Sequence, residues 1–405
     1  MHEYRNSFSL PVVRWLQFPW IISVFVVGLL AACGGGGSDG GGSAGLSAAA
    51  LLGQQIFNDP TLSASGAMSC ATCHDASIGH ASPFNAPAAL GGPNLNIQGT
   101  RLPPAIGYLK FNSGFKFDTD GTPMGGFFWD GRVNSLAEQG KKPFLGANEM
   151  ANASPQDVIA KIQLASYANT FKQVFGADIF NDPDAAFDRV GYALERYQIE
   201  DKDFAPFSSK YDAVTAGKAS FTEQEVRGLA WFNREDKGNC AACHSSTKPD
   251  NAPAALFTDF TYDSLGVPRN PDILANAVPT FFDQGLCGPT RTDLSSRSDL
   301  CGKFKVPSLR NVALRKRFFH NGKFDSLAQV VLFYVTRDTN PENWYSRDTF
   351  GNVVPYDDLP VALRGNVNVR EGPYNRRPGQ APALNMQEIA DLVAFLQTLT
   401  DGYTP

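Results

Sequence analysis

The sequence predicts a mainly α-helical protein with extensive loops, built as two similar halves in tandem. Two observations support this fold class. Apolar residues recur at helical spacing in two pairs of segments, one pair in each half of the chain. A Cys-x-x-Cys-His pentapeptide follows the first helix of each pair, and 38 Gly and 27 Pro among 405 residues indicate long irregular connections.

The composition is that of a folded protein of two domains. A chain of 405 residues suffices for two domains of ~150 residues each. Hydrophobic residues make up 43% and charged residues 19%, which is enough apolar material to exclude a wholly disordered chain. The formal net charge is −5, and Lys and Arg form no cluster, so the sequence does not indicate a nucleic-acid-binding protein.

The first 46 residues are predicted to direct export. Residues 1–32 are typical of a signal peptide, with Arg5 and Arg14 ahead of an apolar run that is too short to span a membrane. The junction at Cys33 resembles the bacterial lipobox, whose cysteine carries the lipid, and residues 33–46 form a Gly/Ser-rich linker. We therefore predict an exported lipoprotein on the periplasmic side of a bacterial membrane, attached only through this anchor. The alternative is an ordinary cleaved signal in which this cysteine has no role.

The two pentapeptides predict covalent haem c. Two cysteines about one helical turn apart can form the two thioether bonds, and the adjacent histidine then ligates the iron. A redox-active Cys-x-x-Cys or half of a zinc site is the alternative, but two such pentapeptides in an exported chain favour two haem c groups. The predicted attachment residues are Cys70, Cys73 and His74 in the first motif and Cys240, Cys243 and His244 in the second.

Two cysteines remain after these assignments, Cys287 and Cys301, in a loop rich in Gly, Asp and Ser. In an oxidising compartment we expect them to form a disulfide that closes the loop. Two free thiols are the alternative.

The helices of the two halves correspond in order. They are expected over residues 48–57, 185–199, 223–232 and 386–399. Thr222 and Glu225 fit a capping box at the start of the third helix. The order of helix, haem motif, long loops and closing helix is that of a small cytochrome c domain. We therefore predict two tandem cytochrome c-like domains, residues 47–212 and 213–405, called the N-terminal and C-terminal halves below.

Few residues are available as sixth ligands of the two irons. Besides the two motif histidines, the chain after the signal peptide holds only His80, His320, Met68, Met124, Met150 and Met386. An electron carrier needs both irons six-coordinate, usually with His or Met, whereas a peroxidase needs one iron with an open face. The scarcity favours catalysis over electron carriage.

Further motifs, together with their order, resemble a known superfamily. They are Cys70–His74, Phe128–Arg132, Asn148–Met150, Cys240–His244, Lys305–Val312 and Phe319–Gly322. Over nearly the whole chain after the signal peptide, the sequence resembles the bacterial di-haem cytochrome c peroxidase/MauG superfamily. The resemblance implies a peroxide-dependent oxidoreductase in which each domain surrounds one haem c.

The resemblance also implies roles for residues near the first haem. The haem on His74 would be the site of hydrogen peroxide, with Glu149 as the acid–base group that moves a proton between the peroxide oxygens. Gln139 matches a polar residue of the distal pocket, and Trp129 matches the tryptophan between the two haems. Outside this motif context they would be a solvated acid, a solvated amide and a core aromatic residue.

The resemblance places an axial ligand of the second haem 14 residues after His320. The peroxidase branch has methionine there, whereas this chain has Tyr334, as the MauG branch does. A phenolate favours high-valent iron, whereas a thioether favours Fe(II). The alternative is that Tyr334 belongs to the core and Met386 is the ligand.

Residues 336–345 and the loop Gly365–Pro378 are similar to MbnH-like di-haem enzymes, found beside a partner protein whose tryptophan they oxidise. The function that this implies uses hydrogen peroxide to form a high-valent state of both haem irons and to oxidise an external donor, a tryptophan of a partner protein. One alternative is a peroxide-detoxifying peroxidase fed by a small cytochrome c or cupredoxin. The others are a non-enzymatic di-haem electron carrier and a haem-based sensor.

The sequence departs from the family pattern in two places. His80 lies only six residues after His74, too close to occupy the loop of the displaceable distal histidine of the peroxidase branch. The N-terminal haem is therefore expected to be open at rest. The family also binds calcium between the domains, but Leu102 stands where the Asn ligand belongs, and Asn85 fits only under a different alignment. Calcium is left open, and His320 is expected to be structural.

Overall fold

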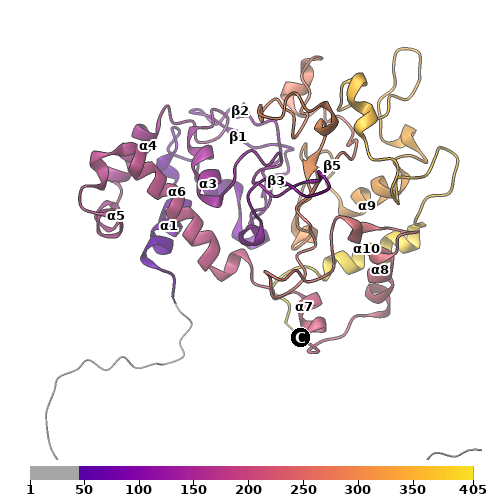
Figure 1. Cartoon of the computed structure of the whole chain (residues 1–405), viewed down its shortest axis with the longest axis horizontal. Helices are drawn as coiled ribbons and strands as arrows, with labels where there is room; N and C mark the ends of the chain where they lie inside the picture. Colours follow the sequence, from indigo (N-terminus) through magenta and orange to yellow (C-terminus); the bar gives the residue numbers. More distant parts are fainter. Residues whose placement is uncertain (1–44, 405) are drawn as a thin grey trace, which may run out of the picture. The chain divides into compact units, whose positions relative to one another are not determined.

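Helices and long loops make up nearly all of the structure, a computed structural model that describes residues 45–404 (Figure 1). The predicted signal peptide and Cys33 lie outside the described residues. The α-helices of the described part are α1 Ala48–Asn58, α2 Cys70–Cys73, α3 Leu136–Leu145, α4 Pro155–Leu164, α5 Ala168–Phe175, α6 Pro183–Glu200, α7 Lys210–Thr215, α8 Glu223–Asn233, α9 Leu327–Thr336 and α10 Met386–Gln397. Within residues 45–404, no helix is long and apolar enough to cross a membrane.

Sheet structure is limited to three antiparallel pairs of two-residue strands in the described residues. The strands are β1 Leu90–Gly91, β2 Ile97–Gln98, β3 Lys116–Phe117, β4 Pro123–Met124, β5 Tyr262–Asp263 and β6 Phe304–Lys305. In register, Leu90 lies opposite Gln98 and Lys116 opposite Met124. Such short pairs fix loops in place and add little core of their own. The predicted mainly helical fold with extensive loops is confirmed.

The four helices predicted from periodicity are α1, α6, α8 and α10, with ends shifted by at most two residues. The capping box at the start of α8 is confirmed: the Glu225 amide donates to Thr222 Oγ1 at 3.2 Å, and the Thr222 amide donates to the Glu225 carboxylate at 2.7 Å. These two bonds satisfy amides that have no partner within the helix. Periodicity and capping thus sufficed to place the helices that open and close each half.

The opening and closing helices pack against each other in the same way in both halves. α1 lies against α6, and α8 lies against α10 (Figure 1). Each contact is close enough to require a glycine. A methyl group on Gly53 would overlap the backbone carbonyl of Ala193 in α6, and one on Gly228 would overlap that of Asp391 in α10. The repeat inferred from sequence therefore extends to the backbone contact between the helices.

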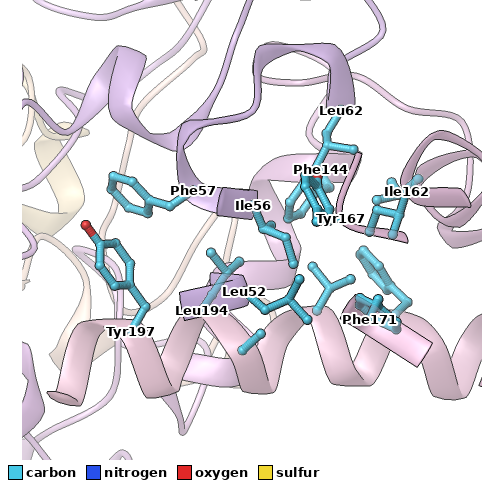
Figure 2. Packing of buried hydrophobic residues seen from close by; sticks show 14 of the residues in the cluster. Leu52, Ile56, Phe57, Leu62, Phe144, Ile162, Tyr167, Phe171, Leu194 and Tyr197 are labelled. Carbon is cyan, nitrogen blue, oxygen red and sulfur yellow. The ribbon is translucent and has the colours of Figure 1, made fainter. Parts of the chain in front are cut away.

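Buried hydrophobic residues form two large clusters. The first draws on residues 52–204 and includes Leu52, Ile56, Phe144 and Leu194 between α1, α3 and α6 (Figure 2). The second draws on residues 211–399, with Phe232, Phe333 and Phe395 at its centre. The division into two cytochrome c-like domains remains a prediction, and this distribution of the core agrees with it.

Replacing Gly53 or Gly228 with Ala is expected to lower the free energy of unfolding by about 1–3 kcal/mol, because the methyl group enters a contact with no free space. Urea unfolding of the holoprotein measures the change. The matched control is Gly365→Ala, where a methyl group would meet nothing within 4 Å. Equal stability of all three variants would contradict the close approach of the helices.

Candidate functional site

Each pentapeptide folds as a single helical turn that presents its cysteines and histidine together. α2 holds the first pair, with the His74 amide donating to the Cys70 carbonyl at 3.0 Å. The second motif forms a 3-10 turn, and the His244 amide donates to the Cys240 carbonyl at 2.8 Å. This is the spacing that two thioether bonds to one porphyrin require.

Two cavities contain these motifs. The first, of about 240 Å³, is lined by the residues of the N-terminal motif and by Glu149, Gln139 and Trp129. The second, of about 180 Å³, is lined by the C-terminal motif and by Tyr334 and Trp129, with apolar side chains from α9 and α10. The structure therefore brings the predicted site residues together in two groups, and Trp129 belongs to both.

The donor sets fit haem c. Burial lowers the pKa of both His74 and His244 to about 4, so both imidazoles are neutral at pH 7 and can bind iron. The His244 Nδ1 lies 3.0 Å from the Phe257 carbonyl, which orients the ring and leaves Nε2 for the metal. Burial raises the pKa of the four motif thiols to about 12, unlike reactive or zinc-bound thiolates. Among the described residues, no group of three or more His, Cys, Asp or Glu could hold a metal ion.

Trp129 is fixed where the two cavities meet. Its side chain is buried, and its Nε1 donates to the Leu102 carbonyl at 2.8 Å. The neighbouring Asp130 is fully buried between two guanidinium groups, with Arg101 at 2.6 Å and Arg132 at 2.8 Å. Removing one partner of such a buried network costs about 3–5 kcal/mol. The indole is thus held by its own hydrogen bond and by the buried ion pairs of the next residue.

Gln139 reaches the first cavity from α3, and Glu149 reaches it from the turn after α3. Burial raises the pKa of the Glu149 carboxyl above its ordinary value, with the nearby charge of Arg132 opposing the shift. The Arg132 guanidinium also stacks on the Phe128 ring at 3.6 Å. A carboxyl group with a raised pKa beside a fixed cation is suited to giving and taking a proton.

Gly146 makes room for that carboxylate. A methyl group at this position would overlap the Glu149 Oε2 and lie 3.1 Å from its Cδ. We expect Gly146→Ala to displace the carboxylate and slow the reaction with hydrogen peroxide by up to about 10²-fold, a typical cost of an ångström-scale displacement. Stopped-flow mixing with peroxide measures the rate, with Gly365→Ala as control. An unchanged rate would show that the position of the carboxylate is not critical.

Tyr334 lies on α9 and faces the second cavity beside Tyr374, with ring centroids 5.9 Å apart. The methionines of the described part of the chain lie elsewhere. Met386 is 68% exposed, Met68 and Met150 belong to the first core cluster, and Met124 lies in β4; none lines this cavity. Of the two candidate ligands of the second haem, Tyr334 and Met386, it is Tyr334 that lines the cavity of the second pentapeptide.

The remaining histidines lie in aromatic stacks. His80 is buried on the Phe204 ring, with centroids 3.9 Å apart, and is absent from the residues that line the first cavity. Gly79, at a φ of 70°, turns the chain between His74 and His80. His320 stacks on Phe304 at 3.5 Å and is buried at the wall of the second cavity. Both histidines occupy packed positions.

Sequence reasoning missed three features of these cavities. Tyr374 comes from the loop after α9 and lies beside Tyr334. Arg315, which has no carboxylate partner in the described residues, lines the second cavity. Thr290 of the C-terminal half lines the first cavity. These residues lie in loops without a periodic pattern, so no local signal could have revealed them.

Comparison with known proteins agrees with this geometry. The family model described as di-haem cytochrome c peroxidase matches residues 47–220. The methylamine utilization protein MauG of Paracoccus denitrificans is 35% identical over 361 residues, which cover 87% of this chain and 89% of that protein. The chain belongs to the di-haem cytochrome c peroxidase family. Cytochrome c551 peroxidase of Pseudomonas aeruginosa, another relative, is 29% identical over 69% of each chain.

Solved structures give the same result. The diheme peroxidase BthA of Burkholderia thailandensis superposes with a TM-score of 0.80 at 40% identity, over 87% of this chain and 86% of that one. A MauG-like protein associated with microbial copper homeostasis has a TM-score of 0.61 at 22% identity, a likeness of fold alone. As a di-haem cytochrome c peroxidase family member, the protein is an oxidoreductase whose cofactors are two haem c groups.

Proposed function

We propose that this di-haem cytochrome c peroxidase family member uses hydrogen peroxide to oxidise an external donor, and that the donor is a tryptophan side chain of a partner protein. The two haem groups, when bound through the six residues of the pentapeptides, supply the redox chemistry. The observation that carries the proposal is the position of Tyr334 in the second cavity while the methionines lie elsewhere. A phenolate ligand stabilises oxidised iron and disfavours electron uptake from a soluble carrier.

The first cavity supports a role in peroxide activation. Glu149 accepts a proton from one oxygen of hydrogen peroxide and donates it to the other, which leaves as water. Gln139 hydrogen-bonds the bound peroxide, and Arg132 supplies a fixed positive charge near the carboxylate. The cavity walls are formed by buried residues such as Met68 and Met150, which exclude water.

Trp129 provides the route between the two cavities. Because the indole lines both, an electron can pass across it without a further carrier. Its Nε1 is already bonded to the Leu102 carbonyl, so the ring keeps its orientation during the reaction. We assign it the transfer of oxidising equivalents between the two haem sites.

A second candidate function is peroxide detoxification with a small cytochrome c or cupredoxin as donor. It is favoured by relatives named cytochrome c551 peroxidase in Pseudomonas aeruginosa and Nitrosomonas europaea. A di-haem electron carrier requires both irons six-coordinate, whereas His80 is packed away from the first cavity. The carrier is therefore the weaker alternative.

The setting that we propose is the periplasmic side of a bacterial membrane, with a lipid on Cys33 and residues 33–46 as tether. The division at residues 212 and 213 belongs to the same proposal. Calcium between the domains, which the sequence leaves open, is not part of this proposal.

Absorption and low-temperature EPR spectra of the ferric holoprotein, before and after one equivalent of hydrogen peroxide, test the function. We expect one high-spin and one low-spin haem, and both ferric signals should fall together after peroxide. Two low-spin haems indifferent to peroxide would leave an electron carrier. A tryptophan-containing peptide and a reduced small cytochrome c are then offered as donors. Oxygen insertion in the peptide, measured by mass spectrometry, supports the first function, whereas turnover of the cytochrome alone supports the second.

A further inference from the structure

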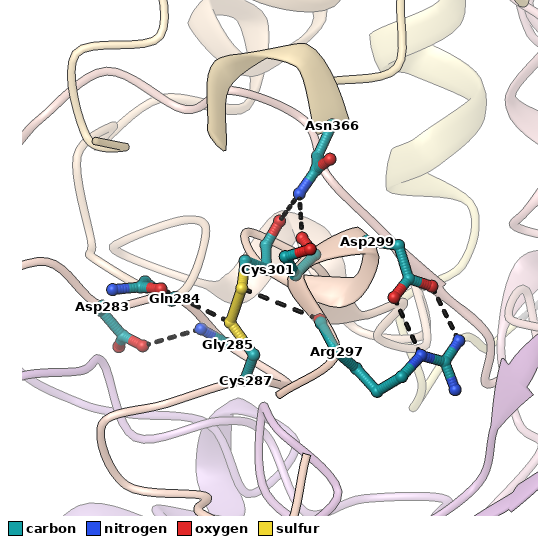
Figure 3. Close-up of a disulfide and its surroundings, with 9 residues drawn as sticks. Asp283, Gln284, Gly285, Cys287, Arg297, Asp299, Cys301 and Asn366 are labelled. Atoms are coloured by element: carbon teal, nitrogen blue, oxygen red, sulfur yellow. Dashed lines mark hydrogen bonds and ion pairs between the residues drawn. A yellow bond between two sulfur atoms is a disulfide. The ribbon is translucent and has the colours of Figure 1, made fainter. Parts of the chain in front are cut away.

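One loop of the C-terminal half is closed by a disulfide. Cys287 and Cys301 are joined, the pairing that the sequence favoured, and both are buried (Figure 3). The Asn366 side chain donates to the carbonyls of Ser298 at 2.6 Å and Cys301 at 3.0 Å, which fixes the far end of the loop. Residues 283–301 are called the disulfide loop here.

The disulfide loop makes buried ionic contacts with the N-terminal half. Asp283 accepts two bonds from Arg101, at 2.5 and 2.7 Å, and Arg101 also pairs with Asp130 at 2.6 Å. Arg291, which is 5% exposed, donates to the carbonyls of Asp130 at 2.9 Å and Gly131 at 3.2 Å. The loop is therefore attached to the segment that carries Trp129.

Arg291 is itself held by a second set of contacts. Its guanidinium stacks on the Phe115 ring at 3.8 Å and pairs with Asp293 at 2.8 Å. Such a side chain has little conformational freedom left, so the backbone next to it is also fixed.

Thr290 stands between these fixed points. Cys287 precedes it by three residues, and Arg291 follows it directly. Thr290 lines the same cavity as Glu149 and Gln139, yet its side chain is exposed to solvent. It therefore lies where this cavity opens to the outside, on a backbone held by the disulfide on one side and by the guanidinium on the other.

We propose that the disulfide loop places Thr290 at the rim of the peroxide cavity and that this residue limits the size of the hydroperoxide that enters. This inference rests on the proposed function, because it takes the first cavity as the peroxide site. The rim admits hydrogen peroxide and retards bulky alkyl hydroperoxides. Selection by steric exclusion requires a rigid edge, which the disulfide and Arg291 provide.

The test compares two oxidants on the ferric holoprotein by stopped flow, hydrogen peroxide and cumene hydroperoxide. Thr290→Phe narrows the rim and should slow the reaction of cumene hydroperoxide about tenfold more than that of hydrogen peroxide. This ratio is within the discrimination that a pocket achieves between substrates differing by one methylene group. The double variant Cys287→Ser/Cys301→Ser loosens the rim and should raise the rate ratio of cumene hydroperoxide to hydrogen peroxide about tenfold. Thr290→Phe is expected to fold, because Thr290 is exposed.

The matched control is Arg297→Gln, which removes the exposed pair between Arg297 and Asp299 in the same loop (Figure 3) and the contact of the guanidinium with the Phe117 ring at 5.4 Å. Its rate ratio should equal that of the wild type. Unchanged ratios in both rim variants would overturn the proposal. Equal slowing of both oxidants, with a lowered melting temperature, would show a structural role alone and also overturn it.

A pair of haem ligands separates failure of the rim from failure of the proposed function. If the wild-type protein does not react with either peroxide, the proposed function fails, and the binding rates of cyanide and of the bulkier imidazole at the high-spin haem then test the rim. A rate ratio of imidazole to cyanide that falls in Thr290→Phe and rises in the double serine variant supports the rim. An equal ratio in all variants overturns it.

Discussion

Replacing Glu149 with Gln lowers the rate of reaction with hydrogen peroxide by about 10²–10⁴-fold, the usual contribution of a positioned acid–base group. The amide keeps the size of the side chain but cannot accept the first proton. The attachment residues of both haem groups are untouched, so the ferric spectrum should equal that of the wild type. Stopped-flow absorption at the high-spin haem measures the rate.

The pH dependence adds a second signature to this prediction. Burial raises the pKa of Glu149 above 4.5, and only the ionised carboxylate can take a proton from peroxide. The wild-type rate should therefore rise with pH through this raised pKa. The rate of Glu149→Gln should show no such rise with pH. Glu138→Gln is the control, since Glu138 is exposed on α3 and caps the Asn134 amide. A wild-type rate in Glu149→Gln would exclude this carboxylate as the acid–base group.

Replacing Tyr334 with Met abolishes the joint response of the two haem groups to peroxide. A thioether in place of the phenolate should raise the reduction potential of the C-terminal haem by a large fraction of the ~0.8 V range that axial ligands set. The C-terminal haem then behaves as an electron acceptor, because a thioether ligand favours Fe(II). Potentiometric titration and EPR after one equivalent of peroxide measure both effects.

Two further variants isolate the role of the phenol oxygen. Tyr334→Phe removes only that oxygen and should leave the C-terminal iron without its sixth protein ligand. Tyr356→Phe removes a hydroxyl group that bonds Asp338 instead, and should leave the potential unchanged. If Tyr334→Met responds to peroxide as the wild type does, the phenolate is not what sustains the reaction.

Local signals predicted the parts of this molecule that are set by short stretches of sequence. The helices α1, α6, α8 and α10 follow from apolar spacing, and the start of α8 follows from Thr222 and Glu225. The pentapeptides need only one helical turn each. Periodicity cannot report where a long loop goes, so the position of Thr290 at the first cavity and of Tyr374 beside Tyr334 was not foreseen.

His80 shows that two residues close in sequence need not line the same cavity. His80 is close to His74 in sequence, yet a left-handed turn at Gly79 places its ring against Phe204. The loop length predicts that His80 is not the displaceable histidine of the peroxidase branch, and its stacked position agrees with this prediction. Six residues of separation therefore say little about which side chains share a cavity.

The bridge from Asp283 through Arg101 to Asp130 has a consequence for protein engineering. The two halves resemble each other and each has its own hydrophobic core, which invites the construction of chimaeras between relatives. A junction near residue 212 would separate Arg101 from its acid at position 283 and Thr290 from the cavity that it borders. A functional exchange of the N-terminal half therefore has to carry residues 283–301 with it, although the 70 residues 213–282 of the other half intervene in the chain. The residues that must be exchanged together to transfer the peroxide site therefore form two separate segments of the chain.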